Sequence, residues 1–164
     1  IQADVPDRAK PPDVGSVAKT EQVLPFSLVR DTRGYIETVV HQINGTYEDG
    51  YYDACLVMIR RLLETLIIEA FEHKSAADKI KNSEGNFFFL DELIDTLAKQ
   101  TDWNLSRNTK DALPRLKKFG DLAAHNRRFN AHRGDIEKLM NDLRVVVQEL
   151  VYLADLASSK KRAT

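Results

Sequence analysis

The sequence predicts an all-α protein, a single bundle of about five helices with an extended N-terminal arm. Gly and Pro are scarce, with 7 and 5 copies in 164 residues, while the helix-favouring Leu, Ala, Glu, Lys and Arg are plentiful. Apolar residues recur at spacings of three and four along most of the chain, which is typical of amphipathic helices. No segment shows the apolar–polar alternation of a strand, and no repeat of fixed period is present. A chain of this length corresponds to one domain.

The two ends of the chain differ from its middle. Residues 1–30 begin with a polar, proline-containing stretch without periodicity, so we interpret them as a linker or arm, ordered only where VLPF (23–26) docks. Residues 31–157 are expected to form the bundle, and residues 158–164 a frayed C-terminal tail. Because the first residue is Ile1, we expect other domains of a longer chain to precede it.

The first two helices are separated by a glycine-containing turn. The first is expected over residues 31–44 and should end at NGTYEDG (44–50). The second, over residues 50–73, has the clearest pattern in the chain, because its apolar residues form one uninterrupted stripe. The stripe consists of Tyr52, Cys55, Leu56, Ile59, Leu62, Leu63, Leu66, Ile67 and Ala70.

Three further helices complete the predicted bundle. One spans residues 87–100 and begins with three consecutive phenylalanines, of which at least one must point away from any single buried face. An oligomer contact and cover by the VLPF segment are the two open explanations for that ring. Ser106 is placed to cap the next helix, in which Pro114 either causes a kink or marks a start near residue 113. Asp135 is placed to cap the last, long helix, whose inward residues are Ile136, Leu139, Met140, Leu143, Val147, Leu150, Val151 and Ala154.

Composition and motifs exclude several classes of protein. The net charge is −1, so any attraction to a polyanion must be local. The single Cys55 lies among apolar residues, which indicates a core position in a reducing, cytoplasmic compartment. Charged residues interrupt the most apolar run, so no membrane span is expected. No metal-ligand spacing, glycine-rich phosphate loop or nucleophile elbow is present, so we expect neither a metal nor a cofactor.

A basic corner stands out between Arg115 and Arg133, where six Lys or Arg residues accompany one acid. Residues four apart share a helix face, so we expect the Asp121 carboxylate to orient the His125 imidazole. The functional hypothesis is a catalytic His125 and Asp121 beside an RNA- or phosphate-binding group made of Lys117, Lys118, Arg127 and Arg128. The alternative is that these cations only favour a helix C-terminus, with Asp121 and His125 in a structural contact.

Two segments carry a resemblance to a known family. GDLAAH (120–125), together with YDACLVMIRRLLETLI (52–67), resembles the HEPN superfamily, specifically a bacterial abortive-infection-like branch. The matching residues are Asp121, Ala124 and His125 in the first segment and Arg60, Arg61 and Glu64 in the second. The resemblance covers roughly residues 30–157 in helix order and spacing.

The resemblance implies a function as well as a fold. HEPN domains are helical bundles that commonly form homodimers, in which two copies of an Arg-x(4–6)-His motif meet over one cleft. Catalytic members are metal-independent endoribonucleases, in which the His acts on the ribose 2′-hydroxyl and the Arg stabilises the phosphate. The implied partners of this chain are therefore RNA and a second copy of itself, in a bacterial defence or stress system.

The chain departs from the catalytic motif at one position. Gly120 stands where the family has its Arg, and the nearest upstream cation at a permitted spacing is Lys118. Arg127 and His132 form a second formal match, in an expected loop. Gly120 lies on the inward side, where the missing side chain would let a neighbouring helix approach closely. Arg60, Arg61 and Glu64 are then structural or site-supporting. Either arginine can pair with Glu64 on their own helix, and Glu64 or Arg61 can bond across the interface to Asp121 or His125.

Three functions remain open at the level of sequence. The departure at Gly120 favours a HEPN-like, dimerising RNA-associated or regulatory module over catalytic turnover. The alternatives are an active metal-independent endoribonuclease that uses His125 and a purely structural interaction or dimerisation domain of a larger protein. An RNA-directed role requires the 115–133 corner to line a cleft with His125 accessible. A structural role requires His125 to be buried in hydrogen bonds.

Overall fold

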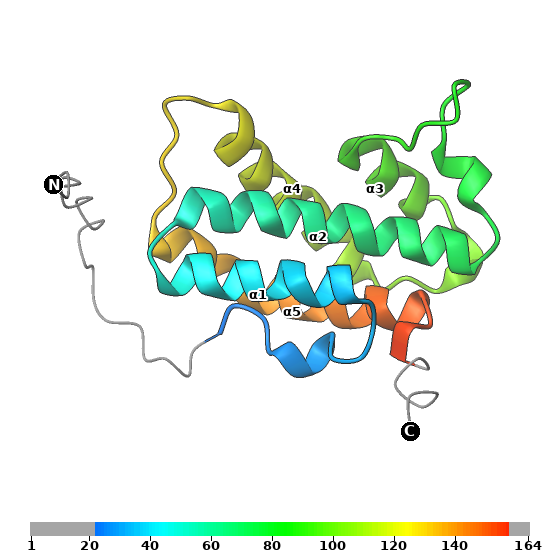
Figure 1. The fold of residues 1–164 in the computed structure, drawn as a ribbon. Helices are drawn as coiled ribbons and strands as arrows, with labels where there is room; N and C mark the ends of the chain where they lie inside the picture. The colour runs from blue at the N-terminus through cyan, green and yellow to red at the C-terminus, as the bar shows by residue number, and fades with distance from the viewer. Residues whose placement is uncertain (1–21, 158–164) are drawn as a thin grey trace, which may run out of the picture.

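A computed structural model describes residues 22–157, so the predicted arm up to residue 21 and the tail at 158–164 lie outside the described residues. The described part is a bundle of five α-helices, and the predicted fold class is confirmed (Figure 1). The helices are α1 (Gly34–Glu48), α2 (Tyr52–His73), α3 (Leu90–Ala98), α4 (Arg107–His125) and α5 (Arg133–Leu153). Three short 3-10 helices, η1 (Phe26–Leu28), η2 (Ala77–Ile80) and η3 (Thr101–Trp103), lie in the connections. Between residues 22 and 157 the only β-type pairing is an isolated bridge between Lys81 and Phe87.

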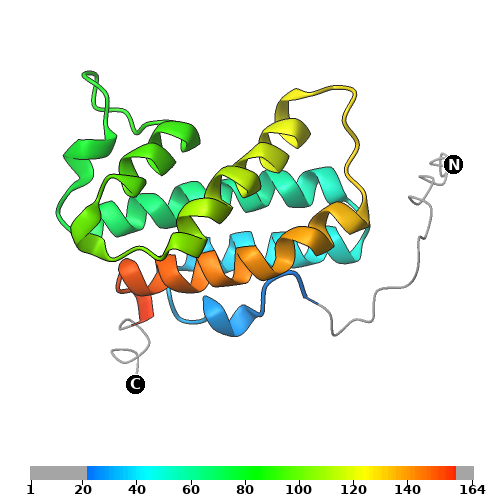
Figure 2. The same ribbon diagram turned by 180° about the vertical axis from the view of Figure 1, so that it is seen from behind.

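Helix α2 is the central element of the bundle. It packs against α1, α3, α4 and α5, and the ribbon views show it between the other helices (Figures 1 and 2). Its predicted stripe faces the core, where Cys55 and all seven apolar residues from Leu56 to Ala70 in the stripe are buried. Helix α2 thus contacts every other α-helix of the bundle.

The segment before α1 is docked on the bundle. Val23 and Leu24 are fully buried, which confirms the docking predicted for VLPF. The Asn44 side chain holds this segment, since it accepts from the Leu24 N–H at 3.0 Å and donates to the Leu24 carbonyl at 2.8 Å. The predicted end of the first helix at residue 44 is therefore wrong. The helix continues to Glu48 because Asn44 serves a long-range contact and Tyr47, in the next turn, is buried.

The start of α4 follows the predicted cap. The Thr109 N–H donates to Ser106 Oγ at 3.2 Å, and the Ser106 hydroxyl donates to Glu149 of α5. The helix runs through Pro114, so a start near residue 113 is wrong. Its first two turns are stabilised by the Ser106 cap and by the burial of Thr109 and Ala112. These contributions outweigh the loss of the one backbone hydrogen bond that a proline removes.

The predicted start of α3 and the predicted cap of α5 are each displaced by three residues. Helix α3 begins at Leu90 rather than residue 87, because the Phe88 N–H donates to the Ile80 carbonyl at 2.8 Å instead of entering the helix. Helix α5 begins at Arg133 after an N-cap at His132. Asp135 is the third residue of α5, where its carboxylate accepts from the His132 N–H at 2.8 Å, as in a capping box.

Helix α4 and the loop 126–132 create an open corner of the bundle. The two ribbon views agree that α4 diverges from α5 towards its C-terminal end, and that the loop then returns to the start of α5 (Figures 1 and 2). No helix within residues 22–157 is long and apolar enough to cross a bilayer.

Candidate functional site

Helices α2 and α4 pack closely at Gly120. A Cβ atom built on Gly120 would lie 2.8 Å from Cβ of Arg60, which is shorter than real contacts between such atoms. The sequence-based expectation of a close helix approach at this glycine agrees with this geometry. Position 120 therefore faces α2 rather than solvent, and a side chain there would collide with the neighbouring helix.

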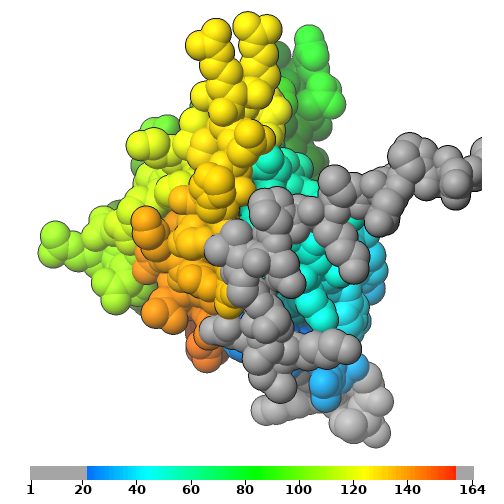
Figure 3. Space-filling model, turned by 90° about the vertical axis from the view of Figure 1, so that its left-hand side faces the viewer, coloured from blue at the N-terminus to red at the C-terminus, as the bar shows by residue number. Residues whose placement is uncertain are grey.

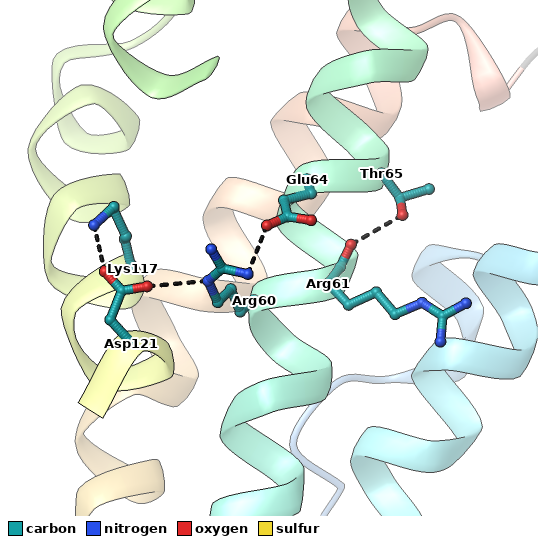
Figure 4. Close-up of polar contacts among 6 residues, drawn as sticks. All are labelled: Arg60, Arg61, Glu64, Thr65, Lys117 and Asp121. Carbon is teal, nitrogen blue, oxygen red and sulfur yellow. Dashed lines mark hydrogen bonds and ion pairs between the residues drawn. The ribbon is translucent and has the colours of Figure 1, made fainter. Parts of the chain in front are cut away.

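The close approach brings a chain of charged side chains together across α2 and α4. Arg60 Nε donates to Asp121 Oδ1 at 3.0 Å, and Arg60 Nη1 pairs with Glu64 Oε1 at 2.8 Å (Figure 4). The second carboxylate oxygen of Asp121 accepts from Lys117 Nζ, one turn earlier on α4. Each of these four side chains is between 22% and 30% exposed, so the interactions are only partly screened by water.

Burial and charge act in opposite directions on the two acids of this cluster. Burial alone would raise the pKa of Asp121, but the hydrogen bonds and charges of Lys117 and Arg60 outweigh it and hold that pKa below its usual range. The pKa of Glu64 is raised, because its burial and the nearby Asp121 charge outweigh the attraction of Arg60. The environment thus stabilises the ionised form of Asp121 and disfavours the ionised form of Glu64.

The geometry corrects two expectations about Asp121. Its two oxygens accept from Arg60 and Lys117, and no hydrogen bond joins it to His125 among the described residues. The Asp121 carboxylate was expected to orient the His125 imidazole. It instead accepts hydrogen bonds from charged donors, Arg60 on the facing helix and Lys117 one turn earlier on α4. The contact across the interface comes from Arg60, whereas the Arg61 side chain is exposed and points away from the cluster, towards α1 (Figure 4).

A cavity of about 910 Å³ lies beside this cluster, between α3 and the end of α4. All six residues that the sequence suggested for catalysis or phosphate binding line it: Lys117, Lys118, Asp121, His125, Arg127 and Arg128. His125 is exposed at the last position of α4. The basic corner of residues 115–133 thus lines a cavity with an accessible His125, as the hypothesis of an RNA-directed role requires.

The cations of the cavity differ in how they are engaged. Lys117 is bonded to Asp121, whereas Lys118, Arg127 and Arg128 make no ion pair within residues 22–157. Lys118 and His125 are two helical turns apart on one face of α4, which corresponds to about 10 Å along the helix axis. Lys118 is therefore the α4 cation that makes no ion pair in the described residues and lies on the same side of the helix as His125.

The loop that carries the two arginines is held at both ends. Asn126 Oδ1 accepts from the Arg128 N–H at 3.0 Å, and the Asn126 carbonyl accepts from the Phe129 N–H at 3.0 Å. At the far end, the Ala131 N–H donates to Asp53 Oδ1 of α2 at 2.9 Å. Figure 3, which views this end of the molecule, shows the loop in yellow standing out from the surface. Its arginines are thus presented from a fixed backbone.

The second formal motif match is split between two cavities. Arg127 lines the cavity beside α4, whereas His132 is the N-cap of α5 and lines a separate cavity of about 720 Å³ at the start of α2 and α5. The two side chains therefore do not share a site within the described chain. Within residues 22–157, no group of three or more His, Cys, Asp or Glu side chains could hold a metal ion.

The opposite wall of the main cavity was not predicted from the sequence. Asp91, Ile94 and Asp95 of α3 line it, and the two aspartates are exposed and free of ion pairs in the described residues. Their spacing of four places them on the polar face of a helix, which the periodicity of α3 indicates. The periodicity does not say that this face lies opposite the end of α4. The cavity therefore has a basic wall on α4 and its loop and an acidic wall on α3.

A family model described as a domain of unknown function, DUF4145, matches residues 41–163, which is most of the chain. The chain belongs to the DUF4145 family. The match begins within α1 and contains every residue that lines the cavity between α3 and α4. No curated protein and no solved structure matches the chain. The cavity is thus part of the DUF4145 domain proper, and the description of the family names no activity.

Proposed function

We propose that this DUF4145 domain is a HEPN-like, dimerising module that binds RNA in the cavity between α3 and α4, as part of a bacterial defence or stress system. One observation carries the proposal: Lys118, Arg127 and Arg128, without ion-pair partners in the described chain, line the same cavity as the exposed His125. The resemblance of GDLAAH and RRLLE to HEPN sequences supplies RNA as the ligand and a second copy of the chain as the partner.

The chemistry of the basic wall suits a phosphate backbone. Arginine donates two parallel hydrogen bonds to phosphate oxygens, and lysine supplies a compact point charge. The two arginines come from a loop whose backbone is held by Asn126 and Asp53, so the backbone needs little ordering when a phosphate binds. Asp121, the acid nearest to these cations on α4, is neutralised by Arg60 and Lys117 and does not compete for them.

Binding is tested with a labelled single-stranded RNA in a fluorescence anisotropy titration at several salt concentrations. Lys118→Ala, Arg127→Ala and Arg128→Ala should each weaken binding and lower the slope of log K against log salt by about 0.7 per lost phosphate contact. Arg107→Ala is the matched control, because Arg107 lies at the other end of α4 with its side chain 93% exposed. Equal binding by all four variants would refute this cavity as the RNA site.

A metal-independent endoribonuclease is the second candidate, and the accessibility of His125 favours it. As a base, the imidazole would take the proton of a ribose 2′-hydroxyl, which attacks the adjacent phosphorus. The bond to the 5′-oxygen of the next nucleotide breaks with its electron pair on that oxygen, which takes a proton from water. A 2′,3′-cyclic phosphate remains. Lys118 or Arg127 would stabilise the negative charge that develops on the phosphate. The imidazole lacks the orienting bond expected from Asp121, which favours binding over rapid turnover.

Turnover is tested by incubating single-stranded RNA with the wild type and with His125→Ala, in EDTA. Cyclic-phosphate ends that appear with the wild type and disappear in the variant would establish a ribonuclease. If RNA is bound but both proteins are inert at high concentration, the domain is a binding module. If no RNA is bound, a structural interaction domain remains, and light scattering of the purified protein tests the proposed dimer.

A further inference from the structure

We propose that the cavity of about 720 Å³ at the start of α2 and α5 holds a nucleobase of the same RNA strand whose phosphates lie on Arg127 and Arg128. The inference rests on the proposed RNA-binding function and assigns a second subsite to it. The space is called the tyrosine cavity below, after Tyr51 and Tyr52 in its lining. The ligand class that follows is single-stranded RNA, because a paired base has no face free for stacking.

Three residues with planar rings line the tyrosine cavity: Tyr51, Tyr52 and His132. Tyr51 is 54% exposed, and its side chain makes no capping hydrogen bond at the start of α2. His132 is exposed at the N-cap of α5, on the other side of the cavity. Because every base has a face that stacks on such rings, this lining suits a base without selecting its sequence.

Contacts among three helices hold the side of the cavity that Tyr52 and Arg133 form. The Tyr52 ring packs edge-to-face against the buried Tyr47 of α1, with 5.9 Å between the ring centroids. The Tyr47 hydroxyl accepts from Arg133 Nε of α5 at 3.2 Å, and the same nitrogen lies 2.7 Å from Glu137 Oε1. A cavity whose side is fixed in this way loses little conformational freedom when a base enters it.

The charges of the tyrosine cavity are balanced within the protein. Arg133 is the only Lys or Arg that lines it among the described residues, and it is paired with Glu137. The N-terminal ends of α2 and α5 attract anions through their helix dipoles, but each has an aspartate in its first turn, Asp53 and Asp135. The cavity therefore exerts little net attraction on a phosphate, and the uncharged base is the part of a nucleotide that it accommodates.

The loop 126–132 connects the tyrosine cavity to the basic wall of the main cavity. Arg127 and Arg128 line the main cavity, and His132 lines the tyrosine cavity (Figures 1 and 2 show the loop between α4 and the start of α5). Because the loop backbone is held at both ends, the two subsites keep a fixed separation. Arg128 and His132 are four residues apart, so their Cα atoms are at most about 14 Å apart. A strand of about four stacked nucleotides, at about 3.4 Å each, covers that distance.

The test uses the full chain and three labelled probes: an oligoadenylate, an oligomer of the same length without bases, and an RNA duplex. AMP is titrated separately by calorimetry. Tyr51→Ala should weaken oligoadenylate binding about 5- to 150-fold, the range for one stacked base, and leave binding of the other two probes unchanged. Tyr51→Phe should bind the oligoadenylate as the wild type does, because stacking requires the ring and not the hydroxyl. Tyr35→Ala is the matched control, because Tyr35 on α1 is 53% exposed and lines neither cavity.

The outcomes separate this inference from the proposed function. If Arg127→Ala weakens all three probes while Tyr51→Ala weakens only the oligoadenylate, both subsites are supported. If Tyr51→Ala leaves all three unchanged, or weakens all three alike, the base subsite is refuted while RNA binding at the basic wall stands. If the wild type binds AMP through Tyr51 but none of the RNA probes, the cavity takes a free nucleotide, and both the strand and the proposed function are refuted. Binding of neither RNA nor AMP refutes both as well.

Discussion

Replacing Gly120 by alanine tests the close packing of α2 on α4 with a single atom. The new Cβ would lie 2.8 Å from Cβ of Arg60 and 3.3 Å from its Cδ. The first of these atoms is fixed to the α2 backbone and cannot rotate away. The two helices must therefore separate, or α4 must shift along α2, before the methyl group is accommodated.

The size of the effect follows from two opposing terms. Alanine is favoured over glycine within a helix by about 0.8–1.0 kcal/mol, whereas overpacking of a well-packed interface costs about 1–3 kcal/mol. Gly120→Ala should therefore range from neutral to about 2 kcal/mol less stable than the wild type. The same change at Gly45, inside α1, meets no atom within 4 Å and should stabilise the protein. The two variants should differ by about 1–3 kcal/mol, which is the overpacking term alone.

Urea denaturation followed by circular dichroism measures this difference. The helix propensity term is the same in both variants, so the comparison between them isolates the contact with Arg60. If Gly120→Ala raises the free energy of unfolding as much as Gly45→Ala does, α2 and α4 are not in close contact at this point. Close helix packing would then not be the reason for a glycine in the GDLAAH segment.

Two further predictions concern charge. Asp121→Asn should destabilise the protein by about 1–2 kcal/mol at pH 7, whereas Glu64→Gln should be neutral or stabilising, because the fold favours ionised Asp121 and disfavours ionised Glu64. The lowered pKa of Asp121 means that its contribution is complete above the unfolded value of about 3.9 and is lost as the pH falls further. Urea titrations at pH 7 and pH 3 should therefore show the Asp121→Asn deficit shrinking in acid, and a deficit that does not change with pH would contradict the ion-pair account. Replacing Asp91 and Asp95 together by asparagine should tighten RNA binding several-fold at low salt and less at high salt, as anisotropy would show, and unchanged affinity would mean that phosphates do not approach the α3 wall.

The periodicity of apolar residues predicts the fold class and the number of helices better than it predicts where each helix begins and ends. The stripe on α2 alone indicates a helix buried on one side, and the structure surrounds it with four partners. The end of α1 was misplaced because Asn44 and Gly45 usually terminate helices, whereas in this fold Asn44 bonds to Leu24, 20 residues earlier. A contact between residues this far apart leaves no periodic pattern in the sequence, so local sequence does not predict it.

The basic wall of the candidate site could be predicted, and the acidic wall could not. Residues of one helix share a face by spacing alone, which is why Lys117, Lys118, Asp121 and His125 were grouped before their positions were known. The partner of Asp121 depends on which helix packs opposite it, and the sequence suggested Arg61 or Glu64 where the structure has Arg60. The spacing of Asp91 and Asp95 predicts that they share one face of a helix. Their position across the cavity from α4 depends on tertiary packing, which the spacing does not contain.

The contact between Gly120 and Arg60 also has an evolutionary consequence. A larger residue at position 120 requires either a smaller residue at position 60 or a wider separation of α2 and α4. We therefore expect these two positions to vary together among DUF4145 sequences, although they lie on different helices. A member with a larger residue at position 120 should have a small residue at position 60, because the two side chains share one contact between α2 and α4. The identity of these two residues would then report how closely the two helices pack in each member.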